Sequence, residues 1–233
     1  MGHRKRFGPE QLQAELAETA VQPFISVLEE LFTDSKMFES YNRFCSSGFQ
    51  LADHAETKIM AGSHKRLRGY LIKKYSNDKP GKKQLRSYMH RIEGARLLRT
   101  FIAEQDFQHV VAPKKFLYEL PSSFPERYLV IAEKFDLLTR NETDRAYSKI
   151  DKDQAQELAV ILYYFRGLNS TAENLPFTEE GKIAFIDTER WHQDKDLLRK
   201  VGDRLPWKRL REVEAAHERL RRDGARPFES MFK

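Results

Sequence analysis

The chain of 233 residues contains a single cysteine, Cys45, so it forms no internal disulfide and no zinc site built from several thiolates. No stretch approaches the roughly 18 consecutive apolar residues that a membrane-spanning helix needs. The residues from Met1 onward lack the apolar region of a secretory signal peptide, and no two histidines have the His-x-x-x-His spacing of a zinc motif. We therefore expect a cytoplasmic protein without a membrane span, stabilised by packing alone.

Acidic residues are scarce between His64 and Arg99, where twelve lysines and arginines accompany only Asp78 and Glu93. The whole chain has a net charge of +6, so this segment holds more than the entire surplus. Such a segment favours an anionic ligand or an acidic partner, although most of these charges could equally form a solvated surface. The chain has no helix-turn-helix, zinc-finger or aromatic-basic sheet motif, which argues against nucleic acid as the partner.

The first 135 residues alternate between helical and strand-like patterns. Apolar residues three or four apart predict one amphipathic helix over 9–32 and another over 85–103. Strands joined by turns are expected in three further segments: 41–75, 110–120 and 127–132. This half of the chain should therefore alternate helix, small sheet, helix and small sheet.

The second half of the chain has a different texture. It predicts an apolar helix over 149–166, a short buried strand over 182–186 and two charged helices within 194–222. The two tryptophans, Trp191 and Trp207, are expected to pack in the core or between the two parts of the chain. Together the two halves predict an α+β fold with a mainly helical second part.

Lys73 and Glu93 stand out as polar residues among apolar neighbours. Side chains alternate along a strand, so Lys73 should share a face with Leu71, and a lysine on the inner face needs an anion. Glu93 is one of the two acids of the basic segment and lies in a helical pattern. An ion pair between them would satisfy both groups and direct the ammonium toward a phosphate. The alternative is that Lys73 is a surface lysine of an edge strand and Glu93 balances nearby arginines.

Asn174 and Asp187 form a second candidate pair. Asp187 directly follows the predicted strand over 182–186, and a carboxylate at a strand end is well placed to hold a divalent cation. The amide oxygen of Asn174 could share that cation, and Mg²⁺ prefers such oxygen ligands. The alternative is that Asn174 caps a turn and Asp187 caps the next helix.

The order of these elements resembles the protein-kinase-like superfamily over roughly residues 48–191. Asp187-Thr188-Glu189 occupies the place of the Asp-Phe-Gly element, and Ile72-Lys73 looks like the end of the Val-Ala-Ile-Lys strand. The resemblance implies a bilobal fold with a small antiparallel sheet and helix in the N-lobe and a minimal helical C-lobe. The implied boundaries are 1–40 for an N-terminal helical extension, 41–135 for the N-lobe and 136–233 for the C-lobe.

The resemblance also implies ATP and Mg²⁺ as cofactors, bound between the two lobes. Lys73 would bind the phosphates and Glu93 would position Lys73. Asn174 and Asp187 would hold the metal. The adenine would lie at the residues that follow the last strand of the N-lobe, which are Glu133, Lys134 and Phe135.

The chain departs from the superfamily pattern at several positions. The catalytic aspartate of the family stands five positions before the loop asparagine, and here that position is Asn169, which cannot accept a proton as a carboxylate would. No Gly-x-Gly-x-x-Gly loop precedes Lys73, and no Ala-Pro-Glu segment follows Asp187. These departures favour weak phosphotransfer or a pseudokinase, similar to compact kinase-like proteins of bacteria and to the effectors that bacteria deliver into host cells.

A second hypothesis comes from a different functional class. The basic segment could serve a non-catalytic interaction module whose positive face binds an acidic protein, a phosphoinositide or RNA. ATP binding in the presence of Mg²⁺ distinguishes the two hypotheses.

Overall fold

The computed structural model describes six parts of the chain: residues 25–52, 59–75, 82–166, 168, 174–189 and 202–226. Within these residues the fold is α+β, with a five-stranded antiparallel sheet, a two-stranded parallel sheet and six helices. The chain divides into two compact units, Met1–Leu85 with Lys115–Glu133 and Arg86–Lys114 with Lys134–Lys233. The predicted fold class is confirmed at this level.

The first unit is built on the antiparallel sheet, whose strand order is β1-β2-β3-β6-β5. The strands are β1 (Phe49–Leu51), β2 (Ile59–His64), β3 (Tyr70–Tyr75), β5 (Lys115–Glu119) and β6 (Tyr128–Glu133). β3 is the central strand, and its register places Lys73 opposite Ala61 of β2 and Val130 of β6. Aromatic and β-branched residues are frequent in these strands, as expected for a half-buried pleated surface.

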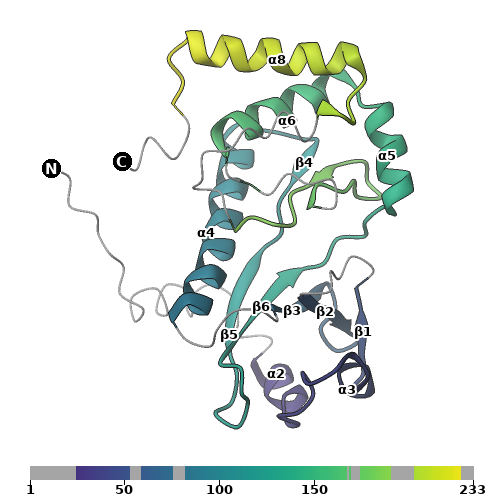
Figure 1. Ribbon diagram of the computed structural model, residues 1–233, viewed down its shortest axis with the longest axis vertical. Helices are drawn as coiled ribbons and strands as arrows, with labels where there is room; N and C mark the ends of the chain where they lie inside the picture. Colours follow the sequence, from purple (N-terminus) through teal and green to yellow (C-terminus); the bar gives the residue numbers. More distant parts are fainter. Residues whose placement is uncertain are drawn as a thin grey trace, which may run out of the picture. The chain divides into compact units, whose positions relative to one another are not determined.

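An aromatic core covers one face of this sheet. Helices α2 (Ile25–Leu31) and α3 (Tyr41–Ser46) belong to the same unit, and Figure 1 shows them beside its strands. Leu28 of α2 and Phe44 of α3 are fully buried in a cluster that also contains Ile72 of β3 and Ile131 of β6. Leu71 and Lys73 directly precede and follow Ile72 in the strand. Because successive side chains of a strand alternate between its faces, these two neighbours lie on the other face of the sheet.

The second unit is mainly helical. It contains most of α4 (Lys82–Glu104), and α5 (Arg140–Ser148), α6 (Lys152–Tyr164) and α8 (Trp207–Arg222), together with strands β4 (Val110–Val111) and β7 (Ile183–Ala184). β4 and β7 pair in parallel, and their apolar side chains share one core with α4, α6 and α8.

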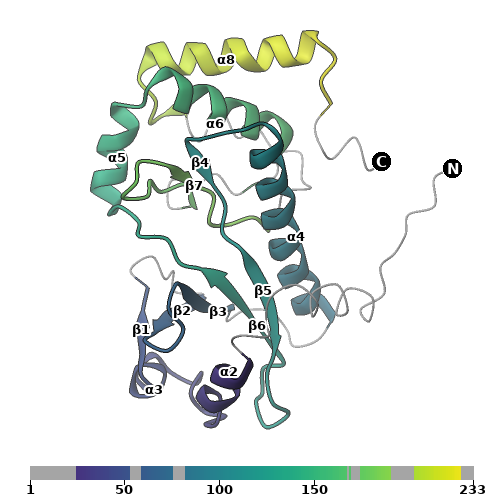
Figure 2. The same cartoon turned by 180° about the vertical axis from the view of Figure 1, so that it is seen from behind.

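Contacts between α6 and α8 hold the two helices together. Both views of the molecule show α8 lying along α6 (Figures 1 and 2). The hydroxyl of Tyr163 donates to the carbonyl oxygen of Ala225 at 2.8 Å, and Nε2 of His217 lies 2.7 Å from the carbonyl oxygen of Ala159. The charged helix predicted after Pro206 therefore docks through its buried face.

Several predicted elements are confirmed, and others need correction. The helices predicted over 85–103 and 149–166 are α4 and α6, whereas the helix predicted over 9–32 is described only as α2. The strand predicted over 110–120 is wrong as one element, because β4 and β5 belong to different sheets. Pro113 lies between them, and proline lacks the N–H group that a sheet ladder needs.

Two further predictions fail for local reasons. Residues 41–46 form helix α3 rather than a strand, since Ser40 accepts a hydrogen bond from the backbone N–H of Arg43 and caps the helix. Trp207 is 67% exposed, so its predicted place in the core is wrong. It lies at the first turn of α8, and the guanidinium of Arg211 stacks on its ring at 4.2 Å.

Three predictions fall partly or wholly outside the described residues: helix residues 9–24, helix residues 194–201 and the burial of Trp191. The predicted domain boundaries stay predictions. None of the helices in the described part of the chain combines the length and hydrophobicity that crossing a bilayer would require.

Candidate functional site

Lys73 lies on the central strand of the sheet, so its alternative placement on an edge strand is wrong. The adjacent Lys74 points to the aromatic core: its Nζ donates to the carbonyl oxygen of Phe38 at 3.2 Å and pairs with the carboxylate of Glu126. Because side chains alternate along β3, Lys73 projects from the opposite face. There it shares the face with Ala61 and Val130, which are both buried.

Glu93 is a half-buried residue of α4. Burial raises the pKa of Glu93, and the positive charge of Arg96 partly opposes that rise. The predicted Lys73–Glu93 ion pair joins residues of the two different units, and it stays a prediction. Within the helix, Glu93 follows Arg91 by two positions, or about 200° of rotation, so the two side chains leave nearly opposite faces.

A short hairpin brings the backbones of the two predicted metal ligands together. The backbone N–H of Ile186 donates to the carbonyl oxygen of Asn174 at 3.2 Å, and that of Ala184 donates to Pro176 at 2.8 Å. Gly181 lies in the turn with a φ of 79°, a conformation that glycine adopts without a steric cost. Asn174 is therefore directly beside the residue that precedes Asp187, and both side chains are half-buried.

The same hairpin pairs with the segment that follows β6. Leu137 and Thr178 form an antiparallel bridge, and the backbone N–H of Glu179 donates to the carbonyl oxygen of Asp136 at 2.8 Å. The predicted adenine-binding residues Glu133, Lys134 and Phe135 lead into this bridge, with Glu133 as the last residue of β6. Asn169 lies outside the described residues.

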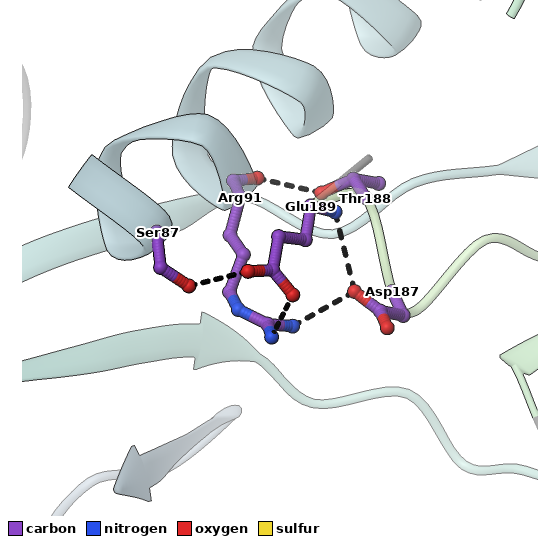
Figure 3. Close-up of polar contacts among 5 residues, drawn as sticks. All are labelled: Ser87, Arg91, Asp187, Thr188 and Glu189. Atoms are coloured by element: carbon purple, nitrogen blue, oxygen red, sulfur yellow. Dashed lines mark hydrogen bonds and ion pairs between the residues drawn. The ribbon is translucent and has the colours of Figure 1, made fainter. Parts of the chain in front are cut away.

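The structure adds a residue that the sequence did not indicate as part of the site. Figure 3 shows Arg91 reaching from α4 to both acids that follow β7. Its Nη1 donates to Oδ1 of Asp187 at 2.8 Å, and its Nη2 donates to Oε2 of Glu189. Ser87, one helical turn before Arg91, donates its hydroxyl to the other oxygen of Glu189. Asp187 is thus held by an arginine of α4.

Local backbone geometry explains why these groups converge. Ser87 and Arg91 are four residues apart on α4 and share one face of the helix. Asp187 and Glu189 flank Thr188, which is fully buried and donates its hydroxyl to the carbonyl oxygen of Arg91 at 2.6 Å. The backbone N–H of Glu189 also donates to Oδ1 of Asp187 at 3.2 Å, which folds the segment into a turn. This local contact is of the kind that the alternative role of Asp187 as a capping residue would use.

In the sequence, Arg91 is one of twelve lysines and arginines between His64 and Arg99. Two acids at alternate positions, Asp187 and Glu189, were the available signal that a cation should face them. Nothing in the sequence indicated which of the many arginines supplies it, because the partners are 96 and 98 residues apart.

One guanidinium faces two carboxylates at this site. Asp187 and Glu189 contribute two carboxylates, and Arg91 contributes one guanidinium whose side chain is 9% exposed. Among the described residues no group of three histidine, cysteine, aspartate or glutamate side chains could hold a metal by itself. Mg²⁺ commonly uses one or two protein carboxylates and completes its shell with phosphates and water. The oxygen donors here fit that mode.

Comparison with models of known protein families finds no match to this chain, and no curated protein matches its sequence. A functional proposal for this chain therefore depends on its own residues. Two features are available for it: Lys73 on the central strand of the first unit, and the hairpin of the second unit that contains Asn174 and leads to Asp187.

Proposed function

We propose that this protein is an atypical kinase-like protein that binds ATP with Mg²⁺ and has either weak phosphotransfer activity or a pseudokinase role. The observation that carries the proposal is the hairpin that places Asn174 beside the residue preceding Asp187. Protein kinases hold their metal with an asparagine and an aspartate of this kind. Their phosphate-binding lysine is on the third strand and its glutamate partner on the next helix, and Lys73 and Glu93 have the same order here.

Each assigned residue has a distinct role in this proposal. The ammonium of Lys73 binds phosphate oxygens as a point charge. Residues Glu133, Lys134 and Phe135 contact the adenine. The side-chain oxygens of Asn174 and Asp187 would hold the metal, and a bound Mg²⁺ supplies charge neutralisation for the phosphates.

Asn169 limits the chemistry that this site can perform. An amide can orient a substrate hydroxyl by a hydrogen bond, but it cannot take up the proton as a carboxylate does. General-base catalysis contributes about 10²- to 10⁴-fold to a rate. Phosphotransfer should therefore be slow or absent even with ATP bound.

Nucleotide binding is the first test of the proposal. We expect the melting temperature of the wild-type protein to rise with ATP and Mg²⁺, because a ligand that binds only the folded state stabilises it. Lys73→Met should reduce this rise strongly. The matched control is Lys65→Met, which removes the same charge from an exposed turn and should leave the rise unchanged. Equal behaviour of the two variants would contradict the assignment of Lys73.

Phosphotransfer is tested by restoring the carboxylate at position 169. Labelled ATP is supplied to the wild type and to Asn169→Asp with several acceptors, including the protein itself. Faster transfer by Asn169→Asp would support a kinase-like site that lacks its base, and inactivity of both forms with ATP bound would support the pseudokinase. Strong activity of the wild type that Asn169→Asp does not change would show that another residue is the base.

A folded protein without any response to ATP would reject the proposal. That result would favour the non-catalytic interaction module, in which the basic segment binds an acidic protein, a phosphoinositide or RNA. The Lys73–Glu93 pair has its own test, since Lys73→Met and Glu93→Gln should reduce ATP affinity non-additively if the two residues act together.

A further inference from the structure

Arg91 donates to Oδ1 of Asp187, which is one of the two carboxylate oxygens available to a metal ion. We propose that Arg91 is an internal competitor of the divalent cation at Asp187, so that α4 keeps the site in a state of low metal affinity until Arg91 moves away. This inference rests on the proposed function, because it concerns the regulation of the same metal site. It makes Arg91 a regulatory residue rather than a catalytic one.

The contacts at Asp187 are the first argument. Oδ1 of Asp187 accepts hydrogen bonds from Nη1 of Arg91 at 2.8 Å and from the backbone N–H of Glu189 at 3.2 Å. Both acceptor positions of this oxygen are therefore in use, and a metal ion that binds Oδ1 has to compete with these two donors for it. Cation binding at Oδ1 is thus in competition with the Arg91 contact.

Charge is the second argument. The Arg91 side chain is only 9% exposed, so water screens its positive charge poorly. A divalent cation bound within a few ångströms of a fixed guanidinium is repelled by it. The two carboxylates without Arg91 would instead offer two negative charges to the cation, which is the arrangement that Mg²⁺ and Mn²⁺ sites use.

Contacts from Glu189 and from α4 fix the position of the Arg91 guanidinium against Asp187. The guanidinium has a planar fork of donors, and the two acids receive one branch each. Ser87 fixes Glu189 from the preceding helical turn, and Thr188 ties the segment to the backbone of Arg91 (Figure 3). Displacing Arg91 from Asp187 thus disturbs contacts on a whole turn of α4, so a shift of this turn would couple to metal affinity.

The test measures Mn²⁺ binding to the full chain without nucleotide, from the electron paramagnetic resonance signal of free Mn²⁺. We expect Arg91→Gln to bind Mn²⁺ about tenfold or more tightly than the wild type, because the competing charge is gone. Arg86→Gln is the matched control, since it removes the same charge from an exposed position of α4 and should leave the affinity close to that of the wild type.

A second substitution identifies the site. Asp187→Asn in the Arg91→Gln background should abolish the gain in Mn²⁺ affinity. Unchanged or weaker Mn²⁺ binding by Arg91→Gln would overturn the inference, and weaker binding would mean that Arg91 orients Asp187 for the metal. A gain that persists with Asp187→Asn would also overturn it.

Arg91→Lys decides the question if Arg91→Gln fails to fold. Lysine keeps the charge, but its single ammonium cannot form the forked contact with two carboxylates. We expect an intermediate gain in Mn²⁺ affinity, and an affinity no higher than that of the wild type would overturn the inference.

Parallel ATP titrations separate this inference from the proposed function. If Arg91→Gln gains Mn²⁺ affinity while neither protein binds ATP, the nucleotide function fails and the competition by Arg91 stands. If both proteins bind ATP but Mn²⁺ affinity does not rise, the competition fails and the nucleotide function stands.

Discussion

Lys74 in the first unit and Arg91 in the second are both nearly buried cations, and their surroundings compensate them differently. Lys74 in the first unit is 12% exposed and has one carboxylate partner, Glu126, together with the carbonyl oxygen and the ring of Phe38. Arg91 in the second unit is 9% exposed and lies between two carboxylates, those of Asp187 and Glu189. Lys74 thus faces one carboxylate, whereas Arg91 faces two.

This difference separates a structural pair from a candidate site. The Lys74 contacts join a strand, a loop and the segment after α2 within one unit. The Arg91 cluster follows a strand end, beside the Asn174 hairpin, and its two carboxylates are oxygen donors of the kind that a divalent cation uses.

The largest effect on stability is expected from Arg91→Gln. Removing one partner from a buried ionic cluster costs about 3–5 kcal/mol, because the remaining charges are left uncompensated. Two carboxylates would then repel each other in a poorly screened site. Urea denaturation at pH 7 measures the loss. Added Mn²⁺ should raise the free energy of unfolding of Arg91→Gln and leave that of Arg86→Gln unchanged. A loss below 1 kcal/mol would remove the distinction between the two clusters.

Lys74→Met should have a smaller effect, of about 2 kcal/mol, because only one carboxylate loses its partner. Within the described residues Oε2 of Glu126 has no hydrogen-bond partner, so this carboxylate depends strongly on Lys74. The double variant Lys74→Met with Glu126→Gln should regain much of the loss. Additive losses in that double-mutant cycle would show that Lys74 and Glu126 do not interact energetically.

Tyr147 extends the comparison to a buried group without charge. It is fully buried, and its hydroxyl donates to the carbonyl oxygen of Leu175 at 2.9 Å. Tyr147→Phe should therefore cost about 1 kcal/mol, the typical contribution of one hydrogen bond. Equilibrium unfolding in urea at pH 7 measures this loss.

The same residue predicts a pH dependence. Burial raises the pKa of Tyr147, with Arg204 opposing the rise and Asp144 adding to it. The unfolded chain then loses the tyrosine proton more readily than the folded protein, so the stability falls as the pH rises above about 10. Tyr147→Phe should reduce this alkaline loss, and an unchanged pH profile would contradict the prediction.

The smallest effect is expected from Trp207→Ala. The ring is largely exposed and contacts the guanidinium of Arg211, so its removal should change the free energy of unfolding by about 0.5 kcal/mol or less. A loss above 2 kcal/mol in the same denaturation assay would show that Trp207 packs against the protein after all.

Long periodic segments were the most predictable parts of the fold. Helices α4 and α6 followed from apolar residues three or four apart, and β6 followed from a dense apolar run. The boundary between β4 and β5 and the short helix α3 were missed, because they depend on a proline and on one capping serine rather than on periodicity. Lys73 and Asp187 were singled out because polar residues stand there among apolar neighbours, and their roles are proposals.

The sequence by itself determined the α+β class, the main helices, and the strand that carries Lys73, since these depend on patterns within about 20 residues. Only the tertiary structure decided that β3 is central, that Trp207 is exposed, and that Arg91 is the cation facing Asp187. The physical reason is that many arginines in this chain could satisfy the same two carboxylates. Which one does so depends on how α4 packs against a segment almost a hundred residues away, and no local pattern records that packing.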